Sequence, residues 1–204
     1  MRFDTCHKAL ASALAALSLL ATSANASDEM SYTYVQAGGG LIDSKVGSRG
    51  DLLEGRLMLG LGDWFFVRAD GYERDFSSQN TISTYYAGSV GVHAVVSERV
   101  DVLFDVGYAN ENIEVGGTDE DFDGPMTALS LRGLSPEGAF EAEARYVHRW
   151  FDDVNGSTED SGSFRFEGMW RATDNFGVYA AGTWETENSG NSDGAYAVGL
   201  RLSL

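Results

Sequence analysis

Apolar and polar residues alternate with a period of two along most of this chain. The clearest runs lie at residues 100–108, 140–147, 164–170 and 196–204. Successive side chains of a β-strand point to opposite faces, so each run gives a strand with one apolar and one polar face. The alternation therefore predicts an all-β fold in which one face of every strand meets an apolar environment.

Ten segments carry this pattern, at 31–42, 52–61, 64–74, 83–96, 100–109, 125–133, 139–150, 162–171, 176–186 and 195–204. An even number of strands is the rule for bacterial outer-membrane barrels. We therefore predict a closed, antiparallel, up-and-down transmembrane β-barrel of ten strands. The segment at 125–133 is the weakest, because it is short and begins at a proline. Eight strands remain possible if two of the segments are hairpins within loops.

The connectors between the segments alternate between short and long. Short turns are expected at 62–63, 97–99, 134–138 and 172–175, and longer loops at 43–51, 75–82, 110–124, 151–161 and 187–194. Outer-membrane barrels have short turns on the periplasmic side and longer loops outside. A soluble barrel or sandwich has no reason to sort its loops in this way.

The N-terminus has the pattern of a targeting signal rather than of a folded element. A short basic start precedes an apolar run at 9–21, and residues 24–26 form a small-x-small cleavage pattern. The run is too short for a spanning helix, which needs about 20 residues. We predict a signal peptide at 1–26 and an outer-membrane barrel at 27–204. The one cysteine, Cys6, lies in this signal, so the mature barrel is expected to have no thiol.

The polar faces of the strands carry charges of both signs. Eight acids and seven arginines lie on them: Glu54, Arg56, Arg68, Asp70, Asp101, Asp105, Arg132, Glu141, Glu143, Arg145, Arg149, Arg165, Glu167, Glu185 and Arg201. This near balance differs from the formal net charge of −17 for the whole chain. Arginine pairs with carboxylates in two-pronged hydrogen bonds where water is scarce. We therefore expect these residues to form a charge network in the lumen, while the apolar face meets lipid.

Alternation alone does not decide which face points inward. A water-soluble barrel would bury its apolar face and expose its charges, so a soluble periplasmic or secreted ligand-binding β-barrel is an alternative. Repetition of the same pattern in ten strands, after a signal peptide, favours the membrane.

Aromatic residues cluster near the predicted strand ends. Those beside short turns are Trp64, Phe65, Phe140, Trp170 and Phe176, and those beside long loops are Tyr72, Phe76, Tyr85, Tyr86, Tyr108, Trp150, Phe151 and Trp184. Two such bands match the aromatic girdles at the two membrane interfaces.

No catalytic, cofactor or metal site is predicted. His148 is the best catalytic candidate, because a membrane-facing histidine beside Ser and Glu could hydrolyse a lipid A acyl chain. Outer-membrane lipid A deacylases have serine two residues later, where this chain has Trp150, so a lipid A-modifying hydrolase is a weaker alternative. His93 is expected to join Ser89 in a polar network in the lumen. The acidic run at 119–123 lacks the ordered spacing of a Ca²⁺ loop.

The net charge of the chain and its C-terminal strand indicate which partners to expect. Nucleic acid is excluded, because its binding needs a basic face. We expect contact with outer-membrane lipids and lipopolysaccharide, and recognition of the C-terminal strand by the barrel-insertion machinery. The strand ends in Leu204, where outer-membrane barrels usually end in phenylalanine. The protein is expected to be a monomer.

Two short stretches resemble a known family. SYTYVQ at 31–36, directly after the predicted cleavage site, resembles the first strand of small, porin-like outer-membrane β-barrel proteins of gamma-proteobacteria, and DNFGVYA at 174–180 resembles their turn-to-strand pattern. Over the mature chain as a whole the similarity lies in the pattern of residues, and it is specific only in a few short stretches. It implies an outer-membrane protein with a structural or narrow porin-like role. That family has no agreed catalytic residues, so no site is transferred.

Overall fold

The structure is a computed structural model that describes residues 30–43, 49–76, 79–153, 158–187 and 194–204. The predicted signal peptide lies outside these residues. Ten strands form the fold: β1 (Tyr34–Asp43), β2 (Arg49–Leu61), β3 (Phe65–Phe76), β4 (Thr81–Ser97), β5 (Val100–Val115), β6 (Thr118–Leu134), β7 (Phe140–Asp153), β8 (Thr158–Arg171), β9 (Phe176–Glu187) and β10 (Gly194–Ser203). In the described part of the chain, no helix is long and apolar enough to cross a membrane.

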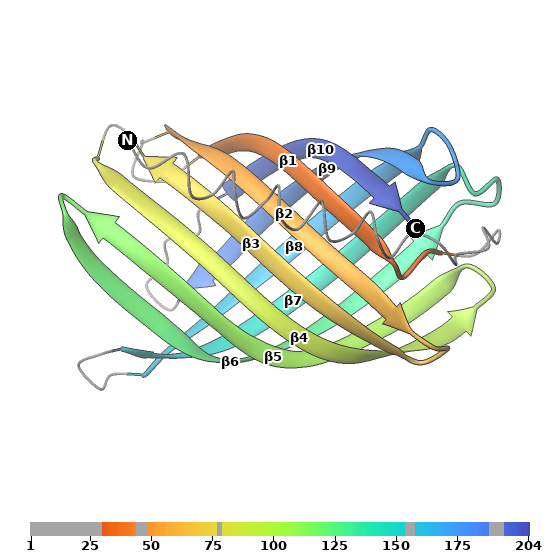
Figure 1. The fold of residues 1–204 in the computed structure, drawn as a ribbon, viewed down its shortest axis with the longest axis horizontal. Coiled ribbons are helices and arrows are strands. Elements are labelled where there is room, and N and C mark those ends of the chain that lie inside the picture. Colours follow the sequence, from red (N-terminus) through yellow and green to blue (C-terminus); the bar gives the residue numbers. More distant parts are fainter. Residues whose placement is uncertain (1–29, 44–48, 77–78, 154–157, 188–193) are drawn as a thin grey trace.

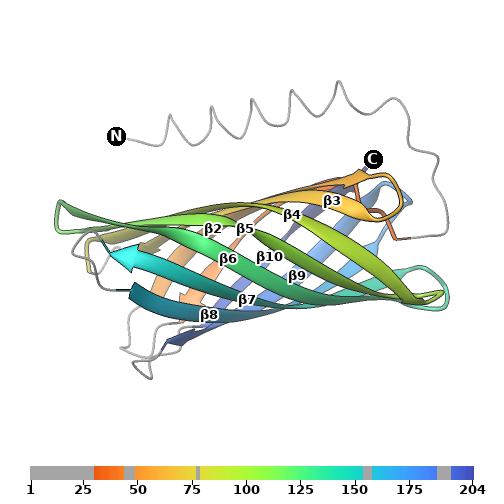
Figure 2. The ribbon, with the colours of Figure 1, turned by 90° about the horizontal axis from the view of Figure 1, so that it is seen from below.

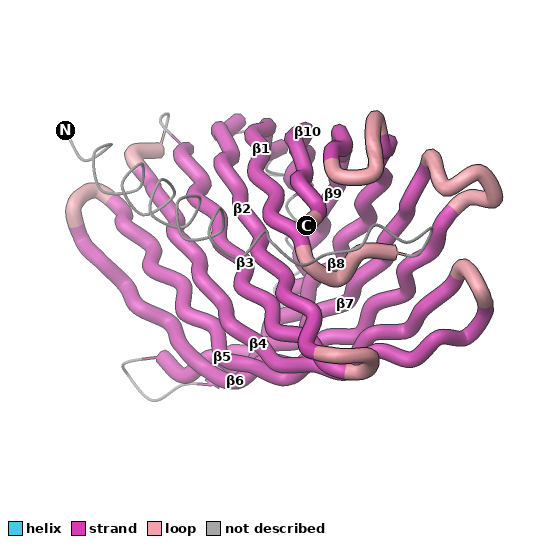
Figure 3. Tube along the Cα trace, turned by 45° about the vertical axis from the view of Figure 1, so that its right-hand side comes forward, coloured by secondary structure: helices cyan, strands magenta, loops and turns pink. Residues whose placement is uncertain are grey.

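The strands close into one antiparallel barrel (Figure 1). Each strand pairs with its neighbours in sequence, and β1 closes the ring by pairing with β10 from Tyr34↔Ser203 to Asp43↔Gly194. Figure 3 shows that the long strands are tilted as they run around the barrel wall. The predicted ten-stranded, up-and-down barrel is therefore confirmed.

The barrel has two distinct ends. One end, here called the turn end, holds the first residues of β1, the C-terminus and the connectors 62–64, 98–99, 135–139 and 172–175. The other, the loop end, holds the last residues of β1, β3, β5, β7 and β9 and the described connector residues 79–80 and 116–117. Strands of 10 to 17 residues join the two ends, and a transmembrane strand needs only about 9–11 residues.

The loop predicted at 110–124 is wrong. Residues 110–115 continue β5 and residues 118–124 belong to β6, so the two strands form one long hairpin that ends in Gly116 and Gly117. Both glycines have positive φ, 60° and 90°, a conformation that glycine adopts at little cost. Figure 2 shows this hairpin reaching beyond the ends of β7 and β8. Its side chains are polar on one face and mixed on the other, which carries Ile113, Val115 and Phe122 among acids, so backbone pairing continues where the period-two hydrophobic signal has weakened.

The strand predicted at 125–133 is longer than expected. β6 begins at Thr118, and Pro125 lies inside it, opposite Tyr108 of β5. The register between β6 and β7 has a gap at residues 124–125, between the pairs Asp123↔Asp152 and Met126↔Arg149. Proline has no N–H to donate to the ladder, so the gap explains how a strand interior accommodates it.

The barrel is inverted relative to a water-soluble one. Its largest fully buried side chains include Arg68, Arg132 and Arg201, each 1% exposed, whereas Leu131 and Val198 are 52% and 61% exposed. A soluble protein buries its apolar residues and exposes its arginines. The alternative of a soluble ligand-binding barrel is therefore not favoured.

The aromatic residues at the turn end lie where the girdle prediction places them. Trp64, Phe65, Phe140, Trp170 and Phe176 all point outward and are exposed. A band of this kind is the expected position of aromatic side chains at a membrane interface.

The prediction for the loop end is only partly correct. Tyr86, Tyr108, Trp150 and Trp184 project outward, but Tyr72, Phe76, Tyr85 and Phe151 project into the lumen. Tyr72 and Phe76 share the alternation of Arg68 and Arg74 on β3, and Phe151 shares that of Arg145 and Arg149 on β7. Tyr85 shares that of the buried Ser83 and Ser89 on β4. The distance of a residue from a loop sets its position along the barrel axis. Its place in the alternation of the strand decides whether its side chain faces the lumen or the outside.

The salt-bridged lumen as candidate functional site

The charged residues selected from the sequence all lie on the interior face. Eleven of the fifteen are buried: Arg56, Arg68, Asp101, Asp105, Arg132, Glu141, Glu143, Arg145, Arg149, Glu167 and Arg201. The other four are half-buried: Glu54, Asp70, Arg165 and Glu185. Alternation in each strand places them there, because their neighbours in sequence point to the outside.

A first layer of ion pairs lies near the turn end. Glu141 of β7 accepts hydrogen bonds from Arg132 Nε at 2.7 Å and from Arg201 Nη1 at 2.6 Å. Arg201 also donates to Glu167 and to Gln36, whose amide donates in turn to Glu167 at 3.0 Å. Two acids and an amide therefore bind two buried guanidinium groups in this layer.

A second layer crosses the barrel. Arg68 of β3 donates to Glu143 of β7 at 2.8 Å. Arg165 of β8 donates through both Nη atoms to the two oxygens of Glu54 on β2, at 2.7 and 2.8 Å. These pairs, here called the crossing pairs, join strands that lie four places apart in the ring. Their side chains therefore occupy the middle of the lumen.

The layers are connected by shared ions. Arg56 donates to Asp70 at 2.5 Å and lies 3.6 Å from Glu167 and 3.8 Å from Glu143. Glu167 also accepts from Arg165 at 2.9 Å. One continuous network thus runs from the turn end to the half-height of the barrel. Since each buried charge faces an opposite charge, the network offsets much of the desolvation cost of burying these ions.

A separate two-pronged pair lies on the β5–β7 wall. Arg145 Nη1 and Nη2 donate to Asp105 Oδ2 and Oδ1 at 2.7 and 2.9 Å, and Ser130 accepts a further bond from Nη1 at 3.3 Å. Asp105 is completely buried. This geometry fixes both side chains and makes the pair a rigid part of the wall.

An apolar floor closes the turn end beneath the network. Tyr34, Met58, Phe66 and Leu103 project inward from four strands and form one buried cluster. Arg201 lies over the ring of Tyr34, at 4.0 Å from its centroid, and so links the floor to the first ion layer. The lumen is therefore filled by apolar side chains at one level and by paired ions at the next.

Sequence reasoning missed several inward residues. Arg74 is buried and pairs with Glu185 across the barrel, and Gln36 and Tyr179 contact the ions directly. For Arg74 and Tyr179 the usable signal was alternation, since they lie an even number of residues from the predicted Arg68 and Glu185 of their strands, whereas no predicted residue on β1 marked the face of Gln36. The position of the Tyr179 side chain requires glycine at residue 38, because a Cβ on Gly38 would lie 2.3 Å from the Tyr179 hydroxyl oxygen.

The two histidines of the barrel lie on opposite faces of its wall. His148 points outward, half-buried, with its ring edge-on to Trp150 at 4.3 Å between centroids. His93 points inward but stacks on Tyr32 at 3.9 Å, and neither its Nδ1 nor Ser89 Oγ has a hydrogen-bond partner. The expected polar network between His93 and Ser89 is therefore wrong.

The described residues also contain no cluster of three or more His, Cys, Asp or Glu side chains that could hold a metal ion. The acidic residues at 119–123 lie instead along β6, in the long hairpin at the loop end. Their carboxylates alternate between the two faces of the strand rather than converge on one point.

Comparison with known proteins gives one family match. Residues 12–133 match the model of the outer membrane protein beta-barrel domain. No curated protein matches the sequence. Among solved structures, Neisserial surface protein A is 13% identical with a TM-score of 0.47, covering 85% of this chain and 98% of that one.

Two further solved structures are similar at the same level. The KdgM porin is 9% identical with a TM-score of 0.43, covering 84% of this chain and 99% of that one. Ail, the attachment invasion locus protein of Yersinia pestis, is 14% identical with a TM-score of 0.38, covering 86% and 100%. At these TM-scores the structural likenesses carry no argument about function.

Proposed function

Because this chain belongs to the outer-membrane protein β-barrel domain family, we propose that it serves the outer membrane as a closed structural barrel with, at most, a narrow porin-like path. The protein is an outer-membrane β-barrel, and its lumen contains a buried salt-bridge network. The observation that supports a closed barrel is the set of crossing pairs, in which Arg68–Glu143 and Arg165–Glu54 join opposite walls.

Closure follows from the energetics of these pairs. To open a path for solutes, the crossing side chains must separate, and each would then lose an opposite charge in a poorly hydrated space. Breaking one buried ion pair typically costs about 3–5 kcal/mol. The apolar floor of Tyr34, Met58, Phe66 and Leu103 adds a second obstruction at the turn end. We therefore propose that solutes of porin size do not pass.

Family membership also orients the barrel. Short turns and both ends of the barrel domain face the periplasm in such proteins, so the long β5–β6 hairpin faces outward. We propose that the outer half of the wall meets lipopolysaccharide and that the C-terminal strand β10 is read by the barrel-insertion machinery. Every strand pairs on both edges, so no edge is left for strand addition, and we propose a monomer.

We also propose that the protein is not an enzyme. A lipid A hydrolase would need a nucleophile beside His148, but the nearest ring to it is that of Trp150 and its strand neighbours are Thr127 and Gly162. The second of these has no side chain, and the sequence position of the deacylase serine is occupied by Trp150.

Conductance in planar bilayers tests the closed-barrel proposal. The folded protein, checked by heat-modifiable migration on a gel, should give no stable openings beside a wide porin measured in the same bilayers. A variant with Arg68→Ser, Glu143→Ser, Met58→Ala and Phe66→Ala should conduct if it inserts, because both obstructions are shortened. Stable openings of wide-porin size in the unmodified protein would contradict the proposal.

A further inference from the structure

The lumen is not equally closed along its length. The side chains of Asp70, Arg165 and Glu185 keep 22%, 13% and 16% of their surface exposed. Nearer the turn end, Arg68 and Arg201 keep 0% and 1%. Solvent therefore enters the lumen from the loop end and stops at the ion network. The solvated part is a vestibule that opens away from the periplasm.

A cavity of about 80 Å³ lies in this vestibule. It is several times larger than the ~10–15 Å³ that a single water needs. Four arginines and two acids line it: Arg56, Arg145, Arg149, Arg165, Glu54 and Asp70. The cavity is thus locally positive, although the chain has a formal net charge of −17.

Arg149 differs from the other arginines of the lumen. It is 5% exposed, yet no carboxylate of the described residues forms an ion pair with it. Its Nη atoms donate only to the hydroxyls of Ser161 and Ser163, at 3.4 and 2.7 Å, and its Nε is buried without any partner. The seven other inward arginines each have a carboxylate partner: Arg56, Arg68, Arg74, Arg132, Arg145, Arg165 and Arg201.

An aromatic stack holds this unpaired cation in place. Arg149 lies over the ring of Tyr85 at 5.0 Å, Tyr85 stacks on Tyr72 at 4.7 Å, and Arg74 lies over Tyr72 at 4.3 Å. Arg74 is itself fixed by Glu185. The stack immobilises the guanidinium of Arg149 without neutralising it, and three of its five N–H groups have no partner among the described residues and can serve a ligand in the cavity.

The nearest acids are already engaged by other groups. Glu111 accepts from Ser83 at 2.7 Å and from Tyr72 at 3.5 Å, and Glu185 pairs with Arg74. Neither forms an ion pair with Arg149. A buried charge in proteins is normally paired, so a fixed guanidinium that has no ion-pair partner among the described residues, at a solvated cavity, is suited to an anion that enters from solvent.

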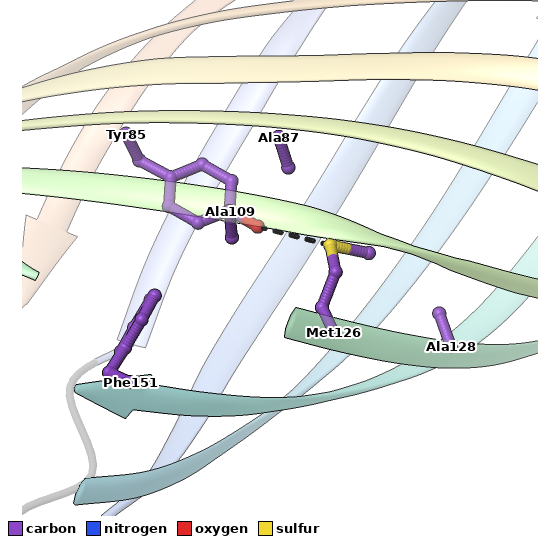
Figure 4. Close-up of a cluster of buried hydrophobic side chains, with 6 residues drawn as sticks. All are labelled: Tyr85, Ala87, Ala109, Met126, Ala128 and Phe151. Atoms are coloured by element: carbon purple, nitrogen blue, oxygen red, sulfur yellow. Dashed lines mark hydrogen bonds between the residues drawn. The ribbon is translucent and has the colours of Figure 1, made fainter. Parts of the chain in front are cut away.

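We propose that Arg149 is the centre of a binding site for a small oxyanion, a carboxylate or phosphate group that enters the vestibule from the loop end. The wall beside it is apolar: Tyr85, Met126 and Phe151 form one cluster with three alanines (Figure 4). A ligand that carries a short apolar or aromatic part next to its anionic group would therefore contact this wall, while the anion contacts Arg149 and the two serines.

NMR of the folded protein in micelles tests this site. Arginine Nε–Hε signals are recorded with ¹⁵N-labelled arginine, and the signal lost in Arg149→Lys identifies Arg149. Sodium phosphate and sodium benzoate are titrated at constant ionic strength against sodium chloride. The Arg149 signal should shift and saturate with at least one of the two oxyanions, and which one does so distinguishes phosphate from carboxylate recognition.

Affinity measured with matched variants completes the test. Arg149→Gln should weaken binding about tenfold or more, the scale of losing a charge-assisted hydrogen bond. Arg99→Gln, which removes the same charge from an exposed position at the turn end, should leave affinity unchanged. The proposal is overturned if no signal of Arg149 saturates with either oxyanion, or if Arg149→Gln, shown to be folded by heat-modifiable migration, binds as tightly as the unmodified protein.

Discussion

Arg68 on β3 and Glu143 on β7 meet in the middle of the barrel, where Arg68 Nη2 lies 2.8 Å from Glu143 Oε1. The two residues are 75 positions apart in sequence and four strands apart in the ring. Both side chains are almost completely inaccessible to solvent. The pair shows the design of the whole lumen, in which ions of opposite sign fill the space that apolar residues fill in a soluble barrel.

The first prediction concerns this pair. Arg68→Met and Glu143→Leu should each lower the free energy of unfolding by about 3–5 kcal/mol, because each leaves a buried ion without its partner. The double variant should lose much less than the sum of the two. Urea unfolding in lipid vesicles measures all three. Glu120→Gln, on the exposed hairpin, is the control and should change stability by less than about 0.5 kcal/mol.

A second prediction concerns the space that Gly38 leaves for Tyr179. A Cβ on Gly38 would lie 2.3 Å from the Tyr179 hydroxyl and 2.8 Å from the carbonyl oxygen of Val198. Gly38→Ala should therefore destabilise the barrel by about 1–3 kcal/mol through overpacking. Gly168, whose Cβ would meet nothing within 4 Å, is the matched control. Equal stability of Gly38→Ala and Gly168→Ala would show that the lumen has room to spare.

The third prediction tests which part of the outward face of β4 lies at the middle of the bilayer. Val90 lies midway along the outward face of β4, and Val96 lies near its turn end. Val90→Arg should cost about 2–4 kcal/mol, as expected at the middle of a bilayer, and Val96→Arg only about 0–1 kcal/mol. Unfolding in lipid vesicles gives both values. Similar costs at the two positions would be inconsistent with a lipid-facing band on β4.

The fourth prediction concerns the hairpin at the loop end. Replacing residues 112–121 with Asn-Gly joins Glu111 to Phe122, which are directly opposite in the register, by a two-residue turn. We expect the shortened protein to insert and to change stability by only about 1 kcal/mol, because outside the hairpin the removed segment pairs only with residues 81–84 of β4. Loss of heat-modifiable migration in this variant would show that the hairpin is needed for the barrel to form.

Much of the fold could be predicted because period-two alternation fixes the face of each side chain. The burial of Arg68, Arg132 and Arg201 follows from parity alone once the apolar face is assigned to lipid. The hairpin at 110–124 could not be predicted in this way, because acids interrupt the apolar residues on its inward face and backbone pairing holds it. Alternation also places Tyr85 and Phe151 inward, because they lie two residues from the inward Ser83 and Arg149 of their own strands, and only their nearness to loops suggested an outward position.

The partners of the ions could not be predicted from the sequence. Arg145 pairs with Asp105, two strands away, rather than with a charge on the adjacent strand β6 or β8. Which acid an arginine reaches depends on the tilt of the strands and the length of both side chains. For the same reason, the lack of a carboxylate beside Arg149 becomes visible only when all the pairs are placed.

The central claim, that apolar side chains meet lipid while charged ones fill the lumen, can be tested residue by residue on β6. The predicted mature chain has no cysteine, so a single cysteine at each position from 128 to 132 can carry a spin label. In vesicles, labels at Leu129 and Leu131 should be accessible to oxygen, which concentrates in lipid. Labels at Ala128, Ser130 and Arg132 should not. The reverse alternation would contradict the account.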